Sequence, residues 1–382
     1  MDFALNDMQK VFVDRVHQLM ERYVAPYAAE WDESGQFPLD TVQKLGREGL
    51  LGMLVPESFG GLGIDPVTFS AVVEEIARFD GSLALTIASH NTICCGHLNQ
   101  FGSEEQKLCY LPKLASGEML AAWALAEAQA GSDAAAITTR AVRDGEFWVL
   151  NGAKIFVTQG TVAGLYIVFA KSVGRDKKEK ISAFLVEKDT PGLKAGEPMK
   201  KFGCRSSDTA SLTLKNVRVP LDHLLGREGE GLRNALQILE LGRVSIGAMA
   251  LGLARAGLEE AVAWSKKRKQ FGQTIADNQA IQWMLADMAT EIDAARLLVY
   301  RAATLIDAGQ PANSEAAMAK LFASETATRT ANKAMQIHGG YGYLCSFALE
   351  RYLRDAKLCE IGEGTSEIQR MIIARNLLRD AK

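Results

Sequence analysis

Apolar residues recur at helical spacing in the first third of the chain. Those of the first segment follow one another every three or four residues and end before Pro26, a pattern typical of an amphipathic helix. They are Met8, Phe12, Val16, Leu19 and Tyr23. Asn6 stands just ahead of the run and is predicted to cap the helix. Residues 71–111 continue in the same style, so this part of the chain is predicted to be helical.

From residue 121 the pattern changes to short runs of alternating or continuously apolar residues, as in strands. The predicted strands are residues 138–142, 147–150, 155–158, 165–170, 181–186 and 210–219. Asp144-Gly145 and Asn151-Gly152 separate the first three strands, and both dipeptides favour tight hairpin turns. The charged run 175–180 is predicted to be a solvated hairpin loop. The middle of the chain is therefore predicted to be a small antiparallel β domain.

Past Gly231 the helical period returns and lasts to the end of the chain. The clearest apolar stripe spans about seven turns and consists of Ile281, Met284, Leu285, Met288, Ile292, Ala295, Val299, Ala302 and Ile306. Further helices are predicted for residues 314–335 and 366–378. This order of elements predicts an α+β fold with an N-terminal all-α domain (1–120), a middle β domain (121–228) and a C-terminal helical domain (229–382).

The composition is that of an ordinary globular protein. Of the 382 residues, 48% are apolar and 23% are charged, and the formal net charge is −3, so neither nucleic acid nor a membrane is an expected partner. Acidic residues near the N-terminus do not fit an export signal, and no apolar run approaches the roughly 18 residues that span a bilayer. The six cysteines form no CxxC pair, which favours reduced thiols in the cytoplasm and gives no reason to expect zinc, another metal or disulfides.

One carboxylate, Glu363, stands between Gly362 and Gly364, just ahead of a predicted helix. Ser366 and Gln369 fit a capping box, so that helix is expected to begin at Ser366. The glycines free the backbone and let a planar group approach closely. A general base needs such a mount, placed rigidly and partly desolvated so that its pKa rises. The same residues also fit a glycine-rich connector whose carboxylate is solvated.

Three other segments could contact an anion or a flavin. Residues 126–133 combine small side chains with a Gly-Ser pair, as in loops whose backbone N–H groups bind phosphate. Arg268 and Phe271 follow a predicted helix and pair a phosphate-binding guanidinium with an aromatic ring. Residues 336–343 place glycines after another helix. Taken singly, these segments are explained as well or better by a surface loop, a basic helix end and a helix C-terminus.

Together, and in this order, these segments resemble the signatures of the flavin-dependent acyl-CoA dehydrogenase family over essentially the whole chain. The matching residues are Ala130-Gly131-Ser132-Asp133, Arg268-Lys269 with Phe271-Gly272, Asp287-Met288-Ala289, Gln336-Ile337-His338-Gly339-Gly340-Tyr341-Gly342 and Glu363-Gly364-Thr365-Ser366-Glu367-Ile368-Gln369-Arg370. The resemblance implies a β-barrel-like middle domain and a C-terminal four-helix bundle. It also implies an oxidoreductase of fatty acid metabolism that holds FAD between these two domains.

The resemblance assigns cofactor contacts to particular residues. Those that would line the flavin ring and pyrophosphate from the β domain are Leu125, Ala126, Gly131 and Ser132, with Phe156 and Thr158 at the other edge. Those that would reach the phosphates and adenosine of a neighbouring subunit's FAD are Arg268, Phe271, Gln279, Gln336, Gly339 and Gly340. Thr365 and Glu367 would lie near the adenine-side phosphates. A shared cofactor site requires at least a dimer, and the family is usually a homotetramer.

Glu363 matches the family's catalytic base. By resemblance it would take the α-proton of an acyl-CoA thioester, while flavin N5 takes the β-hydride and a trans-2-enoyl-CoA forms. The thioester carbonyl would be polarised by the backbone N–H of Glu363 and a flavin ribityl hydroxyl. Some relatives carry the base where this chain has Gly242, which cannot act as one. The positions that match substrate contacts are Ser132, Glu240, Arg243, Gly362 and Gly364. A structural contact between helices accounts for Arg243 equally well.

The sequence departs from the common family pattern at positions that affect substrate and partner. Gly362 stands where many straight-chain members have tyrosine, as in relatives that act on branched chains, so a short branched or alicyclic acyl group is expected. Residues 83–95 contain no arginine, which argues against a glutaryl-type dicarboxylic substrate. Ala126 replaces a threonine or serine that bonds the flavin. Phe156 replaces a frequent tryptophan, which could alter how the electron acceptor docks.

Three functions are compatible with the resemblance. The leading prediction is an acyl-CoA dehydrogenase that passes electrons to electron-transferring flavoprotein. An oxygen-using flavoenzyme of the same fold is the first alternative, although such oxidases are generally longer and such monooxygenases generally lack the glutamate. A flavin-binding protein without activity is the second, and the intact Glu363 argues against it.

Overall fold

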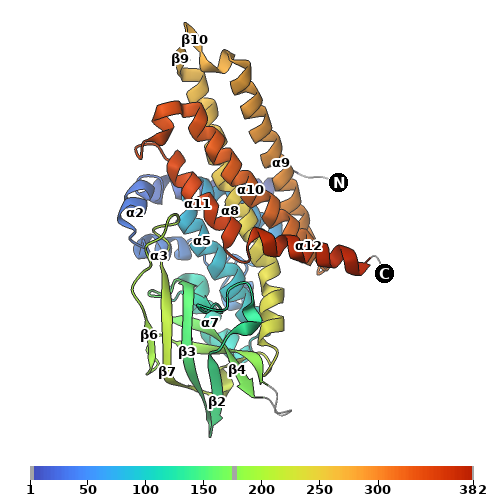
Figure 1. Cartoon of the computed structure of the whole chain (residues 1–382). Helices are drawn as coiled ribbons and strands as arrows, with labels where there is room; N and C mark the ends of the chain where they lie inside the picture. Colours follow the sequence, from blue (N-terminus) through green and yellow to red (C-terminus); the bar gives the residue numbers. More distant parts are fainter. Residues whose placement is uncertain (1–3, 174–178, 381–382) are drawn as a thin grey trace.

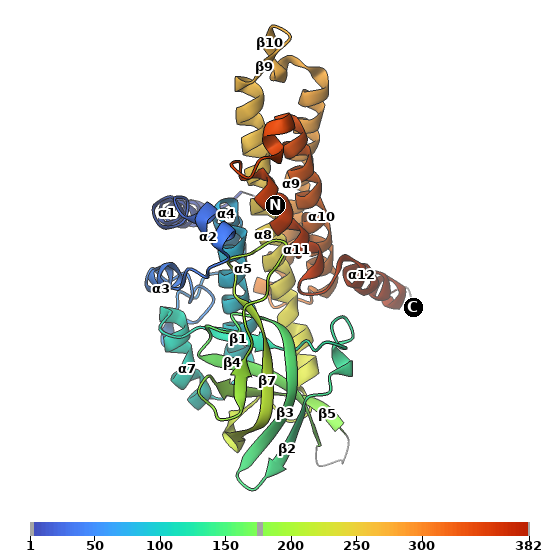
Figure 2. The same cartoon turned by 60° about the vertical axis from the view of Figure 1, so that its left-hand side comes forward.

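The computed structural model describes residues 4–173 and 179–380. It consists of N-terminal helices, a β-sheet and a set of long helices (Figure 1, Figure 2). The sheet lies at one end of the long helix α8 (Gly231–Lys267), whereas the short strands β9 (Lys269–Gln270) and β10 (Gln273–Thr274) lie at the other end. The α+β fold predicted from the sequence is confirmed.

The N-terminal helices begin with a strongly capped one. They are α1 (Asp7–Tyr23), α2 (Ala28–Ser34), α3 (Leu39–Arg47), α4 (Pro66–Phe79), α5 (Gly81–Ser89), α6 (Gly96–Phe101) and α7 (Glu104–Ser116). Asn6 caps α1 as predicted, because its Oδ1 accepts from Gln9 N and Gln9 Oε1 accepts from Asn6 N, both at 2.9 Å. Between α5 and α6 lies a π-helical turn, η2 (His90–Cys95), a feature frequent at functional sites.

Eight strands form the sheet, in the order β6-β7-β3-β2-β4-β5-β8 with β1 beside β4. Their bounds are β1 (Ala121–Ala124), β2 (Arg140–Asp144), β3 (Phe147–Thr158), β4 (Leu165–Val173), β5 (Glu179–Glu187), β6 (Leu193–Ala195), β7 (Thr209–Pro220) and β8 (Leu224–Leu225). Antiparallel pairs dominate, as predicted, although β4 pairs in parallel with β1 and β2. The loop predicted at 175–180 falls mostly on residues 174–178, which lie outside the described residues.

The hairpin predicted at Asn151-Gly152 is wrong. Strand β3 runs through this dipeptide and pairs with β7 on both sides of it. The register shifts between Leu150 and Gly152, which marks a β-bulge. A Cβ at Gly152 would collide with the side chain of Thr139. Glycine is therefore needed here for the close approach of two chain segments, whereas the other predicted turn, at Asp144-Gly145, does join β2 to β3.

The C-terminal helices form the largest part of the molecule. After α8 they are α9 (Gln279–Asp307), α10 (Asn313–His338), α11 (Leu349–Ile361) and α12 (Ser366–Asp380). Helices α8, α9 and α10 lie side by side in both views, and α12 projects from the body (Figure 1, Figure 2). Helix α8 is long and apolar enough to cross a membrane, but 72% of its apolar window is buried inside the protein, as in the central helix of a core.

Helix α8 belongs to two apolar cores at once. In the first, Met249 of α8 packs with Ile76 of α4 and Ala327 of α10, joining the N-terminal helices to the bundle. In the second, Ile238 of α8 belongs to the same buried cluster as Ile167 of β4 and Leu185 of β5. Burying one such aliphatic side chain stabilises the fold by about 1.5–3 kcal/mol. The shared helix therefore fixes where the sheet lies relative to the bundle.

A buried polar contact joins α11 to the segment before β7. Asp355 on α11 is 1% exposed and accepts a hydrogen bond from the backbone N–H of Cys204 at 2.5 Å. Asp80, which is also buried, caps α5 by accepting from Leu83 N at 2.7 Å. Burial raises the pKa of Asp355 to about 7 and that of Asp80 to about 6. Two proton-binding carboxyls thus lie inside the contact between domains.

We expect Asp355→Asn to change how stability depends on pH. The folded-state pKa of about 7 lies above the ordinary value of 3.8, so the folded protein binds this proton more tightly than the unfolded chain does. Wild type therefore loses stability as pH rises from about 4 to about 7, and the asparagine variant lacks that loss. The unfolding free energy of the variant relative to wild type should rise by a few kcal/mol between about pH 5 and about pH 8. Urea unfolding measures the free energy of unfolding of the variant and of wild type at each pH. If the difference between the two proteins is the same at both pH values, the expectation is contradicted.

Candidate active site

The loop between α11 and α12 holds Glu363 in an uncommon backbone conformation. Helix α11 ends at Ile361, and Gly362 is extended with φ −65° and ψ 151°. Glu363 and Gly364 then have φ of 53° and 97°, both left-handed. A left-handed glutamate costs on the order of 1 kcal/mol or more and persists only where its surroundings enforce it. Residues strained in this way cluster at functional sites.

Two side chains from neighbouring helices hold this loop. Lys320 of α10 donates from Nζ to the carbonyl oxygen of Gly364 at 2.8 Å, and Gln369 of α12 donates from Nε2 to the same oxygen at 2.8 Å. Gln369 Nε2 also lies 3.4 Å from the carbonyl oxygen of Glu363. No pattern along the sequence indicated Lys320. The available signal was a lysine among the buried alanines of α10, a place where charge is rarely found without a function.

The capping box predicted at Ser366 and Gln369 is wrong, although α12 does begin at Ser366. Ser366 is the first helical residue, and its buried hydroxyl has no hydrogen-bond partner among the described residues. The cap comes from Thr365, whose Oγ1 accepts from Ile368 N at 3.4 Å. The Gln369 amide does not reach back to Ser366, because it is bonded to the loop carbonyls instead.

The carboxyl group of Glu363 is enclosed by α8 and η2. Its Oε2 is buried and has no hydrogen-bond partner within residues 4–173 and 179–380. A Cβ at Gly242 of α8 would collide with that oxygen and lie 3.2 Å from Ile93 Cγ2, so glycine is required there. Burial raises the pKa of Glu363 to about 7, while the charges of Lys320 and Arg243 oppose this rise. The group can therefore take up or release a proton near neutral pH.

Arg243 of α8 is a second polar group without a partner. It is 3% exposed, and neither Nε nor Nη1 has a hydrogen-bond partner in the described part of the chain. Burial lowers the pKa of its guanidinium, against the charges of Glu363 and Glu240. Buried polar groups are nearly always hydrogen-bonded. Buried atoms of a carboxyl and of a guanidinium that lack partners among the described residues therefore indicate a place for a polar ligand.

A cavity of about 680 Å³ lies beside Glu240, where α8 faces the connection between α9 and α10. Glu240 Oε1 accepts a hydrogen bond from Asn313 Nδ2 at 3.2 Å, and Asn313 Oδ1 accepts one from Asn376 Nδ2 at 3.3 Å. These bonds connect α8 to α10 and α10 to α12. The fold thus brings together Glu240, Arg243 and Glu363, which sequence analysis had selected from separate segments.

The segment 126–133 is fixed by a buried ion pair. Lys154 Nζ of β3 lies 2.8 Å from Glu127 Oε1, and the two side chains are 0% and 3% exposed. The same carboxylate accepts hydrogen bonds from the backbone N–H groups of Thr138 and Thr139. Burial lowers the pKa of Lys154 to about 8. Burial acts to raise the pKa of Glu127, but the hydrogen bonds from Lys154 and the threonines hold it well below its usual range.

The residues predicted to face a flavin from the β domain gather beside this ion pair. They are Leu125, Ala126, Gly131, Ser132, Phe156 and Thr158. The carbonyl oxygen of Ala126 accepts a hydrogen bond from Ile155 N at 3.0 Å, which places the loop against β3. Gly131 faces open space, and Phe156 is 67% exposed with a left-handed φ of 56°. This end of β3 and the neighbouring loop therefore offer exposed backbone and an aromatic ring to a ligand.

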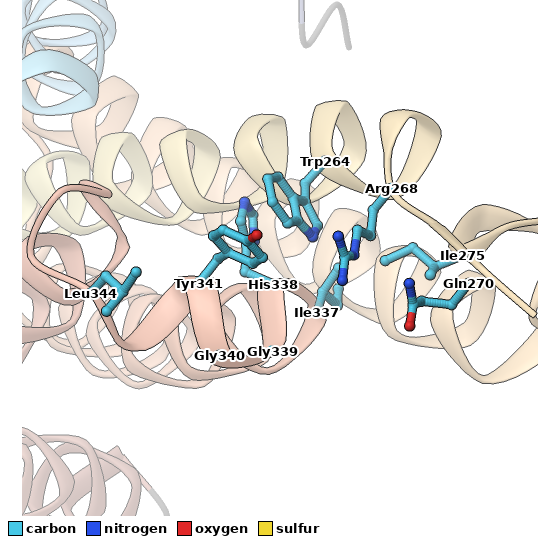
Figure 3. Close-up of a pocket in the computed structure, with 10 residues that line it drawn as sticks. All are labelled: Trp264, Arg268, Gln270, Ile275, Ile337, His338, Gly339, Gly340, Tyr341 and Leu344. Atoms are coloured by element: carbon cyan, nitrogen blue, oxygen red, sulfur yellow. The ribbon is translucent and has the colours of Figure 1, made fainter.

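The residues predicted to reach a neighbouring subunit's cofactor lie at the far end of the bundle, near β9 and β10. Figure 3 shows Arg268 near the turn that contains Gly339 and Gly340, and all three line a cavity of about 460 Å³. The guanidinium carbon of Arg268 lies 5.4 Å from the ring centre of Tyr341. Three predicted residues that do not line this cavity are exposed, namely Phe271, Gln279 and Gln336.

One chain does not bring the two groups of cofactor residues together. The sheet and the β9–β10 tip lie at opposite ends of α8 (Figure 1, Figure 2). This helix has 37 residues and is therefore about 55 Å long. Thr365 and Glu367 lie between the two ends, next to the Glu363 loop. The residues predicted to bind the cofactor therefore form two separate groups within one chain.

Comparison with known proteins covers the whole chain. Models of the acyl-CoA dehydrogenase N-terminal, middle and C-terminal domains match residues 6–118, 122–217 and 229–378. The probable acyl-CoA dehydrogenase YngJ of Bacillus subtilis is 47% identical over 380 residues, which cover 99% of this chain and 100% of that protein. The chain belongs to the acyl-CoA dehydrogenase family. The predicted family, fold class and enzyme class are thereby confirmed.

Solved structures of similar proteins agree with this assignment. Butyryl-CoA dehydrogenase from Megasphaera elsdenii superposes on this acyl-CoA dehydrogenase with a TM-score of 0.96 at 39% identity, covering 99% of this chain and 100% of that one. A chain from work on the electron transferring flavoprotein of Acidaminococcus fermentans superposes with a TM-score of 0.97 at 42% identity, with the same coverage. The similarity therefore extends to the relative placement of all three parts of the fold.

We expect Lys154→Met to lower the free energy of unfolding by about 3–5 kcal/mol, because Glu127 would remain buried without a counter-ion. Adding Glu127→Gln should recover part of this loss. The matched control is Arg218→Met, which breaks an ion pair with Asp144 whose side chains are 49% and 62% exposed and should cost less than about 1 kcal/mol. Denaturant unfolding measures all three variants, and equal losses for the buried and the exposed pair would refute this reasoning.

Proposed function

We propose that this acyl-CoA dehydrogenase converts an acyl-CoA thioester to the trans-2-enoyl-CoA, with Glu363 as the base that takes the proton from C2. One observation carries the proposal: Oε2 of Glu363 is buried with no hydrogen-bond partner among the described residues, and burial raises the pKa of this carboxyl to about 7. The α-proton of a thioester is weakly acidic, so the base must be desolvated and rigidly aimed. The left-handed backbone and the two donors to Gly364 supply that rigidity.

The surroundings of Glu363 suit the polar parts of such a substrate. The backbone N–H of Glu363 donates to the thioester carbonyl and stabilises the negative charge that develops on its oxygen. Arg243 and Glu240 offer polar contacts beside the thioester. Ser132, Gly362 and Gly364 complete the set of proposed substrate residues. The cavity next to Glu240 leaves room for the CoA portion.

We infer that the cofactor is FAD, since the family consists of flavoproteins and the residues present fit the group. Cβ atoms built at Gly131, Gly339 and Gly340 would meet nothing within 4 Å, so a ring or a pyrophosphate can approach the backbone there. Arg268 supplies a guanidinium for phosphate. When bound, FAD would supply the acceptor for the hydride that leaves C3. Ala126 and Phe156 hold the flavin edge by packing, without a hydroxyl or an indole.

The division of the cofactor residues between two ends of α8 favours a shared site in an oligomer, for which we propose a homotetramer. Arg268, Phe271 and Gln279 of one subunit would then contact the FAD of its neighbour. Exposed apolar side chains at the tip and on α12 support association between subunits. They are Phe271 at the tip and Met371, Leu377 and Leu378 on the projecting α12.

Electron-transferring flavoprotein is the proposed electron acceptor. The similarity to a chain studied together with that protein supports it, as does the exposed ring of Phe156 at the flavin edge. Unpaired buried thiols such as Cys94 and Cys359 favour a cytoplasmic location.

A short branched or alicyclic acyl group is the proposed substrate. Gly362 contributes no side chain beside the base, which leaves volume near C2 and C3. A Cβ at this position would make only ordinary contacts, the nearest being 3.4 Å from the carbonyl oxygen of Leu358. The segment 83–95 offers no arginine to a second carboxylate.

We expect Glu363→Gln to retain FAD and bind acyl-CoA but to reduce the flavin about 10²–10⁴ times more slowly, because the amide cannot accept the proton. Anaerobic mixing with a panel of acyl-CoAs, followed by flavin absorbance, measures this. The matched control is Glu118→Gln on an exposed loop, which should react like wild type.

Each alternative function has a distinct result in the same experiment. Near-normal reduction by Glu363→Gln would show that another group is the base. If no acyl-CoA in the panel lowers the flavin absorbance of the wild-type protein, the chain is a flavin-binding protein without activity. Reduced flavin that molecular oxygen re-oxidises within one turnover would indicate an oxidase.

We expect Gly362→Tyr to penalise branched and cyclic acyl groups more than straight ones, because the phenol ring would fill the volume near C3. The ratio of kcat/KM for an isobutyryl-type and a butyryl-type thioester should fall about ten-fold or more, a free-energy difference of about 1.4 kcal/mol. Equal losses for both substrates would remove the argument for a branched substrate.

A further inference from the structure

Lys320 is a buried lysine to which the proposed reaction assigns no chemical role. It lies on α10 and is 0% exposed, on the side of the helix that carries Ala316, Ala319 and Ala323, all buried. No carboxylate in the described residues forms an ion pair with its Nζ. Burying a lysine ammonium costs free energy unless the group is paired with an opposite charge or hydrogen-bonded.

Among the described residues, Lys320 Nζ makes one hydrogen bond, and it reaches the loop that carries the proposed base. Nζ donates to the carbonyl oxygen of Gly364 at 2.8 Å, directly after Glu363. Gln369 Nε2 donates to the same oxygen at the same distance. A neutral amide therefore already holds this carbonyl, so the hydrogen bond alone does not explain why a second donor must be charged.

The charge acts on Glu363. Titratable and charged groups that face the carboxyl or its neighbours come from four elements, namely Arg243 and Glu240 of α8, Cys94 of η2, Lys320 of α10, and Cys359 and Glu360 of α11. Burial raises the pKa of Glu363, and Lys320 is the strongest opposing influence, ahead of Arg243. Burial lowers the pKa of Lys320 itself to about 8, so it still carries its charge at neutral pH.

We propose that Lys320 is a positioning residue for the dehydrogenation: it ties the left-handed loop to α10 and places a positive charge that keeps the Glu363 carboxyl ionised enough to act as a base. The proposal rests on the proposed function, because it assumes that Glu363 takes the proton. Without the charge, burial alone would hold a larger fraction of Glu363 protonated near neutral pH.

The matched variants separate charge from hydrogen bonding. Lys320→Met removes both, Lys320→Gln keeps a donor without the charge, and Gln369→Met removes only the neutral donor to the same oxygen. Lys333→Met removes an outward charge on the same helix, where Lys333 pairs with Asp287 at 3.4 Å. The measurement is the pH profile of kcat/KM for flavin reduction in the holoenzyme, which reports the ionisation of the free enzyme's base.

We expect the acid limb of this profile to move to higher pH by about one unit or more in both Lys320 variants. At pH 7 this corresponds to a loss of roughly five-fold in kcat/KM. Gln369→Met should lower the rate with the limb in its wild-type position, and Lys333→Met should leave the profile unchanged. Lys320→Gln decides the matter if Lys320→Met does not fold.

An unmoved acid limb in either Lys320 variant would overturn the proposal, even if the rate falls, because a merely structural role predicts that result. An equal movement in Gln369→Met would overturn it too, since the charge would then be irrelevant. Failure of the proposed function looks different, because Glu363→Gln would then reduce the flavin at nearly the wild-type rate while the Lys320 profiles remain measurable.

Discussion

The candidate active site depends on one constraint: Oε2 of Glu363 must stay buried without a hydrogen-bond partner among the residues that the structure describes. Water would satisfy Glu363 if the loop turned outward, so the fold has to prevent that. It does so with a left-handed backbone, two donors to the following carbonyl and a glycine on α8 that leaves room for the oxygen. Burial then sets the proton affinity near neutral.

Buried polar groups in this protein mostly hold irregular segments against regular ones. Lys154 and Glu127 fix the loop 126–133 to β3, Asp355 holds the backbone of Cys204, and Lys320 holds Gly364. In each case a side chain on a helix or strand satisfies groups of a loop that cannot satisfy itself. These contacts add little net stability per bond, but they define the loop conformation, which is what a binding surface requires.

The length of α8 has a consequence for assembly. The predicted flavin residues of the β domain and the glycine turn at the tip lie towards opposite ends of this helix, which is about 55 Å long, and the family resemblance assigns both to the cofactor. The two can serve one dinucleotide only if they come from different subunits. In the proposed homotetramer the cofactor site is therefore completed by association, and the exposed apolar residues of the tip and of α12 become interior.

Patterns along the sequence correctly predicted those features that depend on residues close together in the chain. Apolar spacing predicted the long helices because each must bury one face, and the glycines around Glu363 marked the candidate base because they free the local backbone. The same local reasoning failed at Asn151-Gly152, where β7 pairs across the dipeptide, and at Ser366, where the Gln369 amide is drawn to the loop.

Tertiary structure alone decided which distant residues meet. Gly242 and Glu363 are 121 residues apart in the chain. Position 242 must nevertheless lack a side chain, because a Cβ there would collide with the carboxyl group of Glu363. Lys320 and Lys154 have no local pattern that reveals their partners, because burial and long-range hydrogen bonds give them their roles. The sequence by itself therefore determined most of the elements and the candidate base, whereas packing decided the surroundings that set the proton affinity of that carboxyl.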